Sequence, residues 1–70
     1  MYNYEEIFMQ YTNALELHKK VIEKKRKQLN QARRKANYAE VKRLNSILNL
    51  LYQEKCELEE STNGLKKYLN

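Results

Sequence analysis

The stretch KANYAEV, residues 35–41, divides the 70-residue chain into two halves that each have the composition of a helix. Asn37 can adopt the left-handed backbone conformation that ends a helix. The cationic residues at 33–35 suit a helix C-terminus, and Glu40 falls where an acidic side chain favours the first turn of a following helix. The stretch therefore predicts a turn at about Asn37 between two helices.

Apolar residues recur every seven positions on both sides of this turn, as in the a and d positions of a coiled coil. In the first half, one row is Phe8, Leu15, Ile22, Leu29 and Ala36, and its companion row is Tyr4, Tyr11, His18, Lys25 and Ala32. In the second half, one row is Leu44, Leu51, Leu58 and Leu65, and its companion row is Val41, Leu48, Lys55, Thr62 and Leu69. The period predicts a first helix over about 4–36 and a second over about 39–61.

The sequence Ser61-Thr62-Asn63-Gly64 interrupts the second helical pattern. A glycine here is able to end the helix, which would leave residues 62–70 as a short tail. The alternative is a helix that continues with a local weakness of about 1 kcal/mol at Gly64.

The two halves fit one antiparallel register. If the chain folds back between residues 36 and 37, the paired residue numbers add to 73, so Leu15 faces Leu58 and Ile22 faces Leu51. Each a position then meets a d position, as an antiparallel coiled coil requires. We therefore predict an all-α, single-domain helical hairpin over residues 1–70 that dimerises into a four-helix bundle. Its main rival is one uninterrupted helix in a parallel oligomer.

Composition excludes several other classes. The chain has no proline and one glycine, whereas β-sandwiches, α/β folds and phosphate-binding loops need turn residues. Its apolar runs are far shorter than the roughly 20 residues of a membrane span, and its first residues do not resemble a signal peptide. A single cysteine fits a reducing compartment. We expect a cytoplasmic protein without a membrane partner.

Apolar residues are left over after the seam is formed. Two helices make one seam and no enclosed core, and chains this small usually need further contacts to stay folded. The surplus predicts a second interface, formed with another copy in a homodimer or with a larger protein; scattered exposed apolar residues are the alternative. The predicted interface residues are Ile7, Val21, Ile47, Leu50 and Tyr52.

Basic residues are concentrated in the middle of the chain. Residues 19–43 hold eleven of the fourteen Lys and Arg residues against two Glu, a net charge of +9, whereas the remainder carries −4. Such a region could bind a nucleic-acid backbone, dock an acidic protein surface, or be a solvated helix face. The candidate contact residues are Lys24, Lys25, Arg26, Lys27, Arg33, Arg34 and Lys35.

Aromatic residues gather near the beginning of the chain. Tyr2, Tyr4, Phe8 and Tyr11 share one side of the first helical turns. They are expected to pack against Leu65 and Leu69 at the end of the hairpin; an adhesive patch for a partner is the alternative.

The sequence contains no recognisable catalytic set. His18 and Cys56 are the single histidine and cysteine and have no metal-site spacing, and no nucleophile lies near a base. We expect no enzymatic activity, no metal or other cofactor and no small-molecule substrate, and we assign His18 to a polar layer of the seam. The favoured function is a protein–protein interaction or regulatory module that uses the surplus apolar residues; the alternative is a nucleic-acid-binding regulator that uses residues 19–43.

Overall fold

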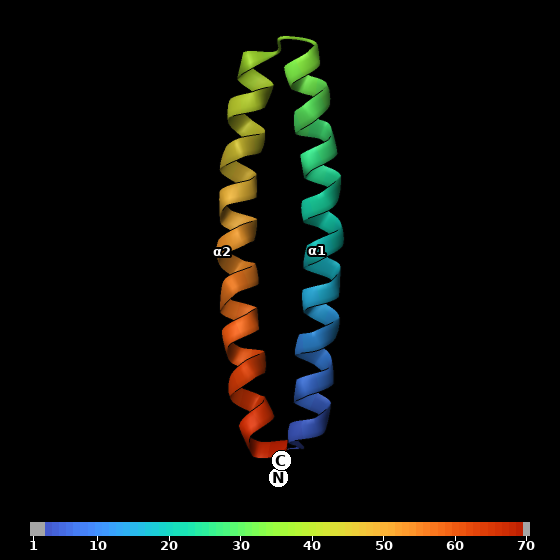
Figure 1. Ribbon diagram of the computed structural model, residues 1–70, viewed down its shortest axis with the longest axis vertical. Helices are drawn as coiled ribbons and strands as arrows, with labels where there is room; N and C mark the ends of the chain where they lie inside the picture. The colour runs from blue at the N-terminus through green and yellow to red at the C-terminus, as the bar shows by residue number, and fades with distance from the viewer. Residues whose placement is uncertain (1–2, 70) are drawn as a thin grey trace.

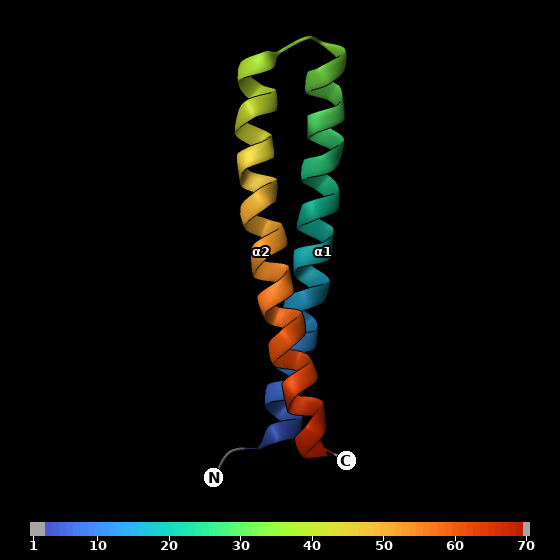
Figure 2. The ribbon, with the colours of Figure 1, turned by 60° about the vertical axis from the view of Figure 1, so that its left-hand side comes forward.

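The computed structural model describes residues 3–69, which form two long helices, α1 (Tyr4–Arg34) and α2 (Tyr38–Leu69). The helices pack antiparallel, so α1 begins and α2 ends at the same end of the molecule (Figure 1). They cross gradually, and α2 passes in front of α1 towards the chain ends in Figure 2. The result is a rod of 52 × 18 × 15 Å. The predicted all-α hairpin is confirmed.

Neither α1 nor α2 contains an apolar window of the length needed to cross a membrane, within residues 3–69.

The start of α1 is fixed by Asn3. Its backbone is extended, and its side-chain oxygen accepts hydrogen bonds from the backbone N–H groups of Glu5 at 3.1 Å and Glu6 at 3.3 Å. This contact satisfies two donors that have no partner within the helix. The acidic side chains of Glu5 and Glu6 also favour the positive end of the helix dipole.

The turn corrects the prediction for Asn37. α1 ends at Arg34, and Ala36 rather than Asn37 has the left-handed conformation, with φ 55°. The Asn37 N–H donates to the carbonyl of Ala32 at 2.9 Å, and the Ala36 N–H donates to that of Arg33 at 3.1 Å. These two bonds form a Schellman motif, which satisfies the last carbonyl groups of α1.

Asn37 instead caps the start of α2. Its side-chain oxygen accepts from the Glu40 N–H at 3.3 Å, as an N-cap does. An N-cap residue needs a non-helical, usually extended backbone. The left-handed position therefore falls on the residue before it, although that residue is an alanine.

The second helix is longer than predicted. Residues 62–69, expected as a tail, are helical, and α2 continues through Gly64 to Leu69. Thr62 is buried and donates its hydroxyl to the Leu58 carbonyl at 2.6 Å, while the rings of Tyr4 and Tyr68 stack with centroids 5.1 Å apart. Packing against α1 offsets the glycine cost of about 1 kcal/mol.

The seam follows the predicted heptad rows. Leu44 is completely buried, and the tightest part of the seam lies in the half of the rod nearest the turn. Ala36 departs from its row because it belongs to the turn and is exposed. The core cluster consists of Ile22, Leu29, Ala32, Leu44 and Leu48, with Val41 and Leu51 packed against it.

At the opposite end of the rod, the aromatic contact with the end of α2 is made to Tyr68, and the expected packing against Leu65 and Leu69 stays a prediction. Tyr4 stacks on Tyr68 and remains 43% exposed, and Phe8 and Tyr11 are half-buried. Tyr2, the remaining member of this predicted cluster, lies outside the described residues.

Candidate interaction surfaces

The rod has two broad faces, one on each side of the seam. In an antiparallel helix pair, residues that precede the seam rows by one position fall on the same face in both helices. Val21 precedes the buried Ile22, and Ile47 precedes the buried Leu48. These two residues therefore lie on one broad face, with one contributed by each helix.

Leu17 and Leu50 extend this surface outward. Leu17 lies one helical turn before Val21, and Leu50 lies one turn after Ile47. Leu17 is 62% exposed and Leu50 is 61% exposed, whereas the other members are half-buried. We call this surface the apolar face, and it consists of Ile7, Leu17, Val21, Ile47 and Leu50.

Tyr52 does not belong to the apolar face. It follows the seam residue Leu51 by one position, so it lies on the opposite broad face. There it lines an open groove of about 490 Å³ together with Lys19, Arg26 and Lys55. Four of the five predicted interface residues therefore share one broad face, with Ile7 about 21 Å from Val21 along α1, and the fifth lies on the opposite face.

Leu17 was missed as an interface residue, although the sequence carried the signal. Leu17 is four positions before Val21 and therefore lies on the same side of the helix. Tyr52 follows the seam residue Leu51 by one position, which places it on the other side of the rod.

A groove with a mainly apolar lining continues the apolar face towards the chain ends. It has a volume of about 350 Å³ and is lined by Tyr11, His18, Glu54, Glu57, Leu58 and Ser61. Within it, His18 Nε2 and Glu54 Oε2 are 2.8 Å apart and join the two helices. His18 therefore lies in the seam as predicted. The register in which paired residue numbers add to 73 sets it opposite Lys55, but its contact is with the neighbouring Glu54. Lys55 is paired with Glu59 at 3.5 Å.

The basic residues divide among several sides of α1. Those at 19, 26 and 33 and those at 20, 27 and 34 form two adjacent columns, because each set repeats every seven residues. The columns extend about 22 Å along the helix, at 1.5 Å per residue. We call them the basic stripe, and they consist of Lys19, Lys20, Arg26, Lys27, Arg33 and Arg34.

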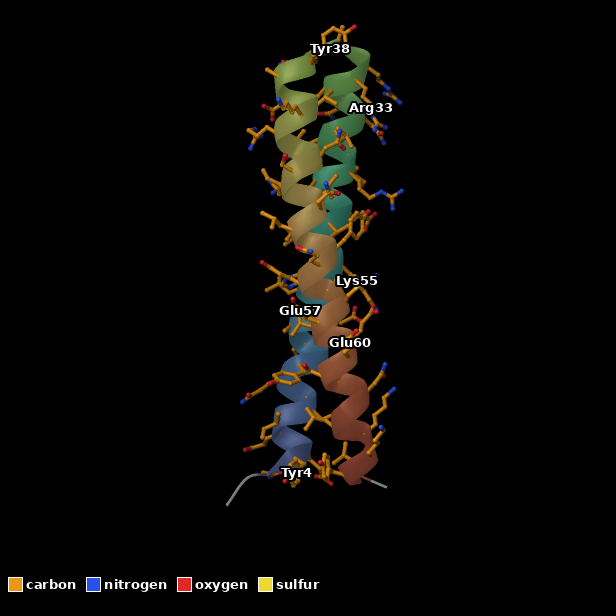
Figure 3. The ribbon with its side chains drawn as sticks, turned by 90° about the vertical axis from the view of Figure 1, so that its left-hand side faces the viewer. Tyr4, Arg33, Tyr38, Lys55, Glu57 and Glu60 are labelled. Atoms are coloured by element: carbon orange, nitrogen blue, oxygen red, sulfur yellow. The ribbon has the colours of Figure 1, made fainter. Side chains whose placement is uncertain are left out.

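The basic stripe covers the outer edge of α1 and the face that carries Tyr52. In Figure 3, Arg33 and Lys55 lie to one side of the rod and Glu57 to the other. Four of the seven predicted contact residues, Arg26, Lys27, Arg33 and Arg34, belong to the stripe. Lys24 and Lys35 lie on the side of the apolar face instead, seven residues after Leu17 and fourteen after Val21.

Lys25 occupies a seam position and is half-buried. Its ammonium group donates to the side-chain oxygen of Gln28 at 3.4 Å. Two members of the stripe have acidic neighbours on α1: Lys19 lies 3.6 Å from Glu16, and Lys27 lies 3.7 Å from Glu23. Exposed pairs of this kind are weak, so the stripe keeps most of its positive charge.

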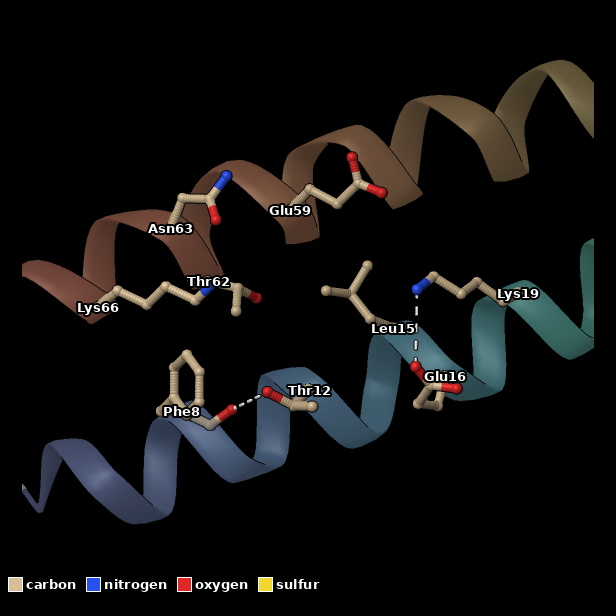
Figure 4. A pocket seen from close by; sticks show the side chains of 9 residues that line it. All are labelled: Phe8, Thr12, Leu15, Glu16, Lys19, Glu59, Thr62, Asn63 and Lys66. Atoms are coloured by element: carbon tan, nitrogen blue, oxygen red, sulfur yellow. Dashed lines mark hydrogen bonds and ion pairs between the residues drawn. The ribbon is translucent and has the colours of Figure 1, made fainter. Parts of the chain in front are cut away.

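A further groove of about 360 Å³ lies on the face that carries Tyr52, near the chain ends (Figure 4). Phe8 and Leu15 form its apolar floor, and Lys66 and Asn63 approach it from α2. The Thr12 hydroxyl in this groove donates to the Phe8 carbonyl at 2.9 Å.

Within residues 3–69, no three His, Cys, Asp or Glu side chains gather as a metal site.

Near the turn, Glu40 and Arg43 form an ion pair on the surface of α2. The hydrogen bond from Arg43, together with its positive charge, lowers the pKa of Glu40 below its usual value. The same contact raises the pKa of the Arg43 guanidinium. The pair links the first turn of α2 to its second and lies at the end of the rod opposite Tyr4.

Comparison with protein-family models, with curated proteins and with solved structures finds no match for this chain.

Proposed function

We propose that this protein is a non-enzymatic interaction module that binds another protein surface through the apolar face. One observation carries the proposal: Leu17 and Val21 of α1 and Ile47 and Leu50 of α2 lie on the same broad face of the rod. Both helices therefore contribute exposed or half-buried apolar side chains to this face. Exposed apolar side chains gathered on one face are typical of protein–protein contact sites.

The energetics support a partner on this face. Burying a leucine side chain contributes about 1.5–3 kcal/mol relative to leaving it in water. Two leucines here are more than half exposed, and the hairpin has a single seam with no enclosed core. Covering the apolar face would therefore give this small fold a second layer of packing. The single cysteine, Cys56, is free and exposed, which suits a cytoplasmic site of action.

Site-specific photocrosslinking tests the proposal. A photoreactive phenylalanine analogue replaces Leu50 in one variant and Gln53 in a matched control, because Gln53 is also exposed on α2 but points away from the apolar face. We expect covalent protein adducts from position 50 and not from position 53. The substitution Val21→Glu should abolish these adducts while the far-ultraviolet circular dichroism stays helical. Equal adduct yields at both positions, or none at either, would refute the proposal.

The basic stripe supports a second candidate function, binding to a nucleic-acid backbone. Six cationic side chains in two adjacent columns present positive charge along about four turns of helix. Contacts of this kind gain affinity by releasing counterions and carry no base specificity. The apolar face lies elsewhere on the rod, so the two functions are compatible.

A charge-reversal variant tests the second candidate. Arg26→Glu, Lys27→Glu and Arg34→Glu together should abolish binding to mixed-sequence RNA and DNA at low salt. In the unmodified protein, log K should fall steeply with log salt. The matched control reverses Lys66 and Lys67, which lie on α2 outside the stripe. Absence of binding by the unmodified protein at low salt, or equal loss in both variants, would eliminate this candidate.

A further inference from the structure

We infer that the partner of the apolar face is a second copy of this chain, bound with the two rods antiparallel to form a four-helix bundle. The inference rests on the proposed function, since it names the occupant of the same face. Three observations carry it: the area of the face, the position of the apolar residues along the rod, and the distribution of charge.

The area of the face suits a stable dimer. The rod measures 52 Å by 18 Å, so one broad face offers a footprint of about 900 Å², close to the roughly 800 Å² per partner of a standard interface. An identical rod is equally long and flat and would cover the whole face. Pairing two hairpins this way also gives the enclosed core that one hairpin does not have.

The exposed apolar residues lie near the middle of the rod. Leu17 and Val21 are about halfway along α1, and Ile47 and Leu50, in the first half of α2, lie opposite residues 26 and 23 of α1 in the register described above. A twofold axis across the rod near Leu50 therefore lays the apolar regions of the two copies over each other, with the Leu17 side chains displaced to either side of the axis. A heterologous, head-to-tail arrangement would instead displace the two regions from each other.

Charge decides the orientation of the second copy. Residues 22–51, the half nearest the turn, carry nine Lys and Arg residues against two Glu, whereas the remaining residues carry five against seven. Parallel rods would place the two strongly positive halves beside each other. Antiparallel rods place each positive half beside a negative half, which is electrostatically favoured.

The sequence of α2 gives the register. Arg43, Leu50 and Glu57 are spaced by seven residues and lie in one column on the side of the apolar face. A twofold axis at Leu50 sets this leucine against Leu50 of the partner subunit. The same axis passes beside Lys24 on α1, whose long side chain reaches the water at the edge of the interface. The axis also sets Arg43 against Glu57 of the partner subunit, twice per dimer. Arg43 already contacts Glu40, but a guanidinium has five N–H donors and can bind a second carboxylate.

Distance measurement between spin labels tests the orientation. The variant Tyr38→Cys with Cys56→Ser carries one label at the turn, where the native tyrosine is 79% exposed. Twelve residues separate position 38 from Leu50, so antiparallel pairing should place the two labels about 36 Å apart along the bundle. Parallel pairing would place them within about 20 Å, the width of two packed helices. The short distance would overturn the inference.

Charge exchange tests the register. Arg43→Glu and Glu57→Arg should each raise the dimer dissociation constant about three- to tenfold, because each creates two repulsive contacts per dimer. The double variant should restore the original value. Gln53→Arg is the matched control for an added charge on α2 and should leave the dissociation constant unchanged. Failure of the double variant to restore dimerisation would overturn the register.

Sedimentation equilibrium separates this inference from the proposed function. A protein that stays monomeric up to about 100 μM, yet gives position-50 adducts with other proteins that Val21→Glu abolishes, overturns the homodimer and leaves the proposed function standing. A monomer without such adducts overturns both. A dimer that Leu50→Glu dissociates into helical monomers supports both.

Discussion

His18 of α1 and Glu54 of α2 form a polar contact of 2.8 Å between Nε2 and Oε2, and this contact links the two helices across the seam. The ion pairs between Lys or Arg and Glu found among residues 3–69 join side chains three or four positions apart on one helix. Among these residues, the side-chain hydrogen bond that joins α1 to α2 is the one between His18 and Glu54, so it depends on the register of the two helices.

Removing the His18–Glu54 contact should lower stability modestly. Glu54 is more than half exposed, so we expect His18→Ala and Glu54→Gln each to reduce the free energy of unfolding by no more than about 1 kcal/mol. Urea unfolding of both single variants and the double variant would give the coupling energy. Additive effects would show that the contact contributes nothing; Glu60→Gln, on the outer edge of α2, is the control for a lost charge.

Replacing Ala36 by glycine should stabilise the hairpin. Alanine in the left-handed conformation costs about 1–2 kcal/mol, and glycine adopts this conformation without that penalty. After the larger entropy of glycine in the unfolded chain is taken into account, we expect a gain of about 0.5–1 kcal/mol. Thermal unfolding measures it. The control, Ala39→Gly in the first turn of α2, should be destabilising, and a loss of stability in Ala36→Gly would contradict the turn geometry.

Gly64→Ala should also stabilise the hairpin, but for a different reason. Gly64 lies inside α2, and an added Cβ would have no atom within 4 Å. Alanine is preferred over glycine in helix interiors by about 1 kcal/mol. A higher urea midpoint and an unchanged or stronger helical signal are expected. Destabilisation would indicate that the chain is not helical at this position.

Leu44 and Leu50 form a matched pair for separating core from surface. Leu44 is fully buried, and Leu44→Ala should cost about 2–5 kcal/mol, enough to unfold much of the hairpin. Leu50→Ala, at a 61% exposed position, should change the stability of the isolated hairpin by less than about 0.5 kcal/mol. Its effect should appear in association instead. Circular dichroism would measure the stability of both variants, and sedimentation would measure their association. A larger loss of stability in Leu50→Ala than in Leu44→Ala would contradict these assignments.

Glu40 should make the hairpin sensitive to acid. Arg43 lowers its pKa in the folded state from the usual 4.5, so the stabilising contact is complete above that value and is lost as the pH falls towards the lowered pKa. Glu40→Gln should therefore be less stable than the parent at neutral pH, with the difference shrinking below pH 4.5. Urea midpoints of the parent and of Glu40→Gln, measured over this pH range, would check the prediction. A stability difference that does not change with pH would contradict the role of the Glu40 carboxylate.

The heptad rows predicted most of this fold because a long, regular hairpin is governed by one periodic seam. The rows predicted Leu15, Ile22, Leu44 and Leu48 in the interior, and all four are buried. The period could not predict the hydrogen bonds at the turn. Asn37 can either end the first helix in the left-handed conformation or cap the start of the second helix with its side chain, and hydrogen bonds to both helices select the second role. The period also could not show that Gly64 is helical, since that outcome depends on packing against α1.

The candidate surfaces were less predictable for a geometric reason. Composition identifies surplus apolar and basic residues, but it does not say which side of a helix each one occupies. Tyr52 and Leu50 are two positions apart in sequence and lie on opposite broad faces. In the same way, Lys24 and Arg26 are near neighbours in sequence that lie on different sides of α1.

The start of α1 and the end of α2 lie at the same end of the rod, and the turn lies about 50 Å away at the other end. A domain fused to either chain end would therefore be held on one side, clear of the turn. In the antiparallel dimer inferred above, two such domains would project from opposite ends of the bundle. The length of the bundle would then fix the distance between them.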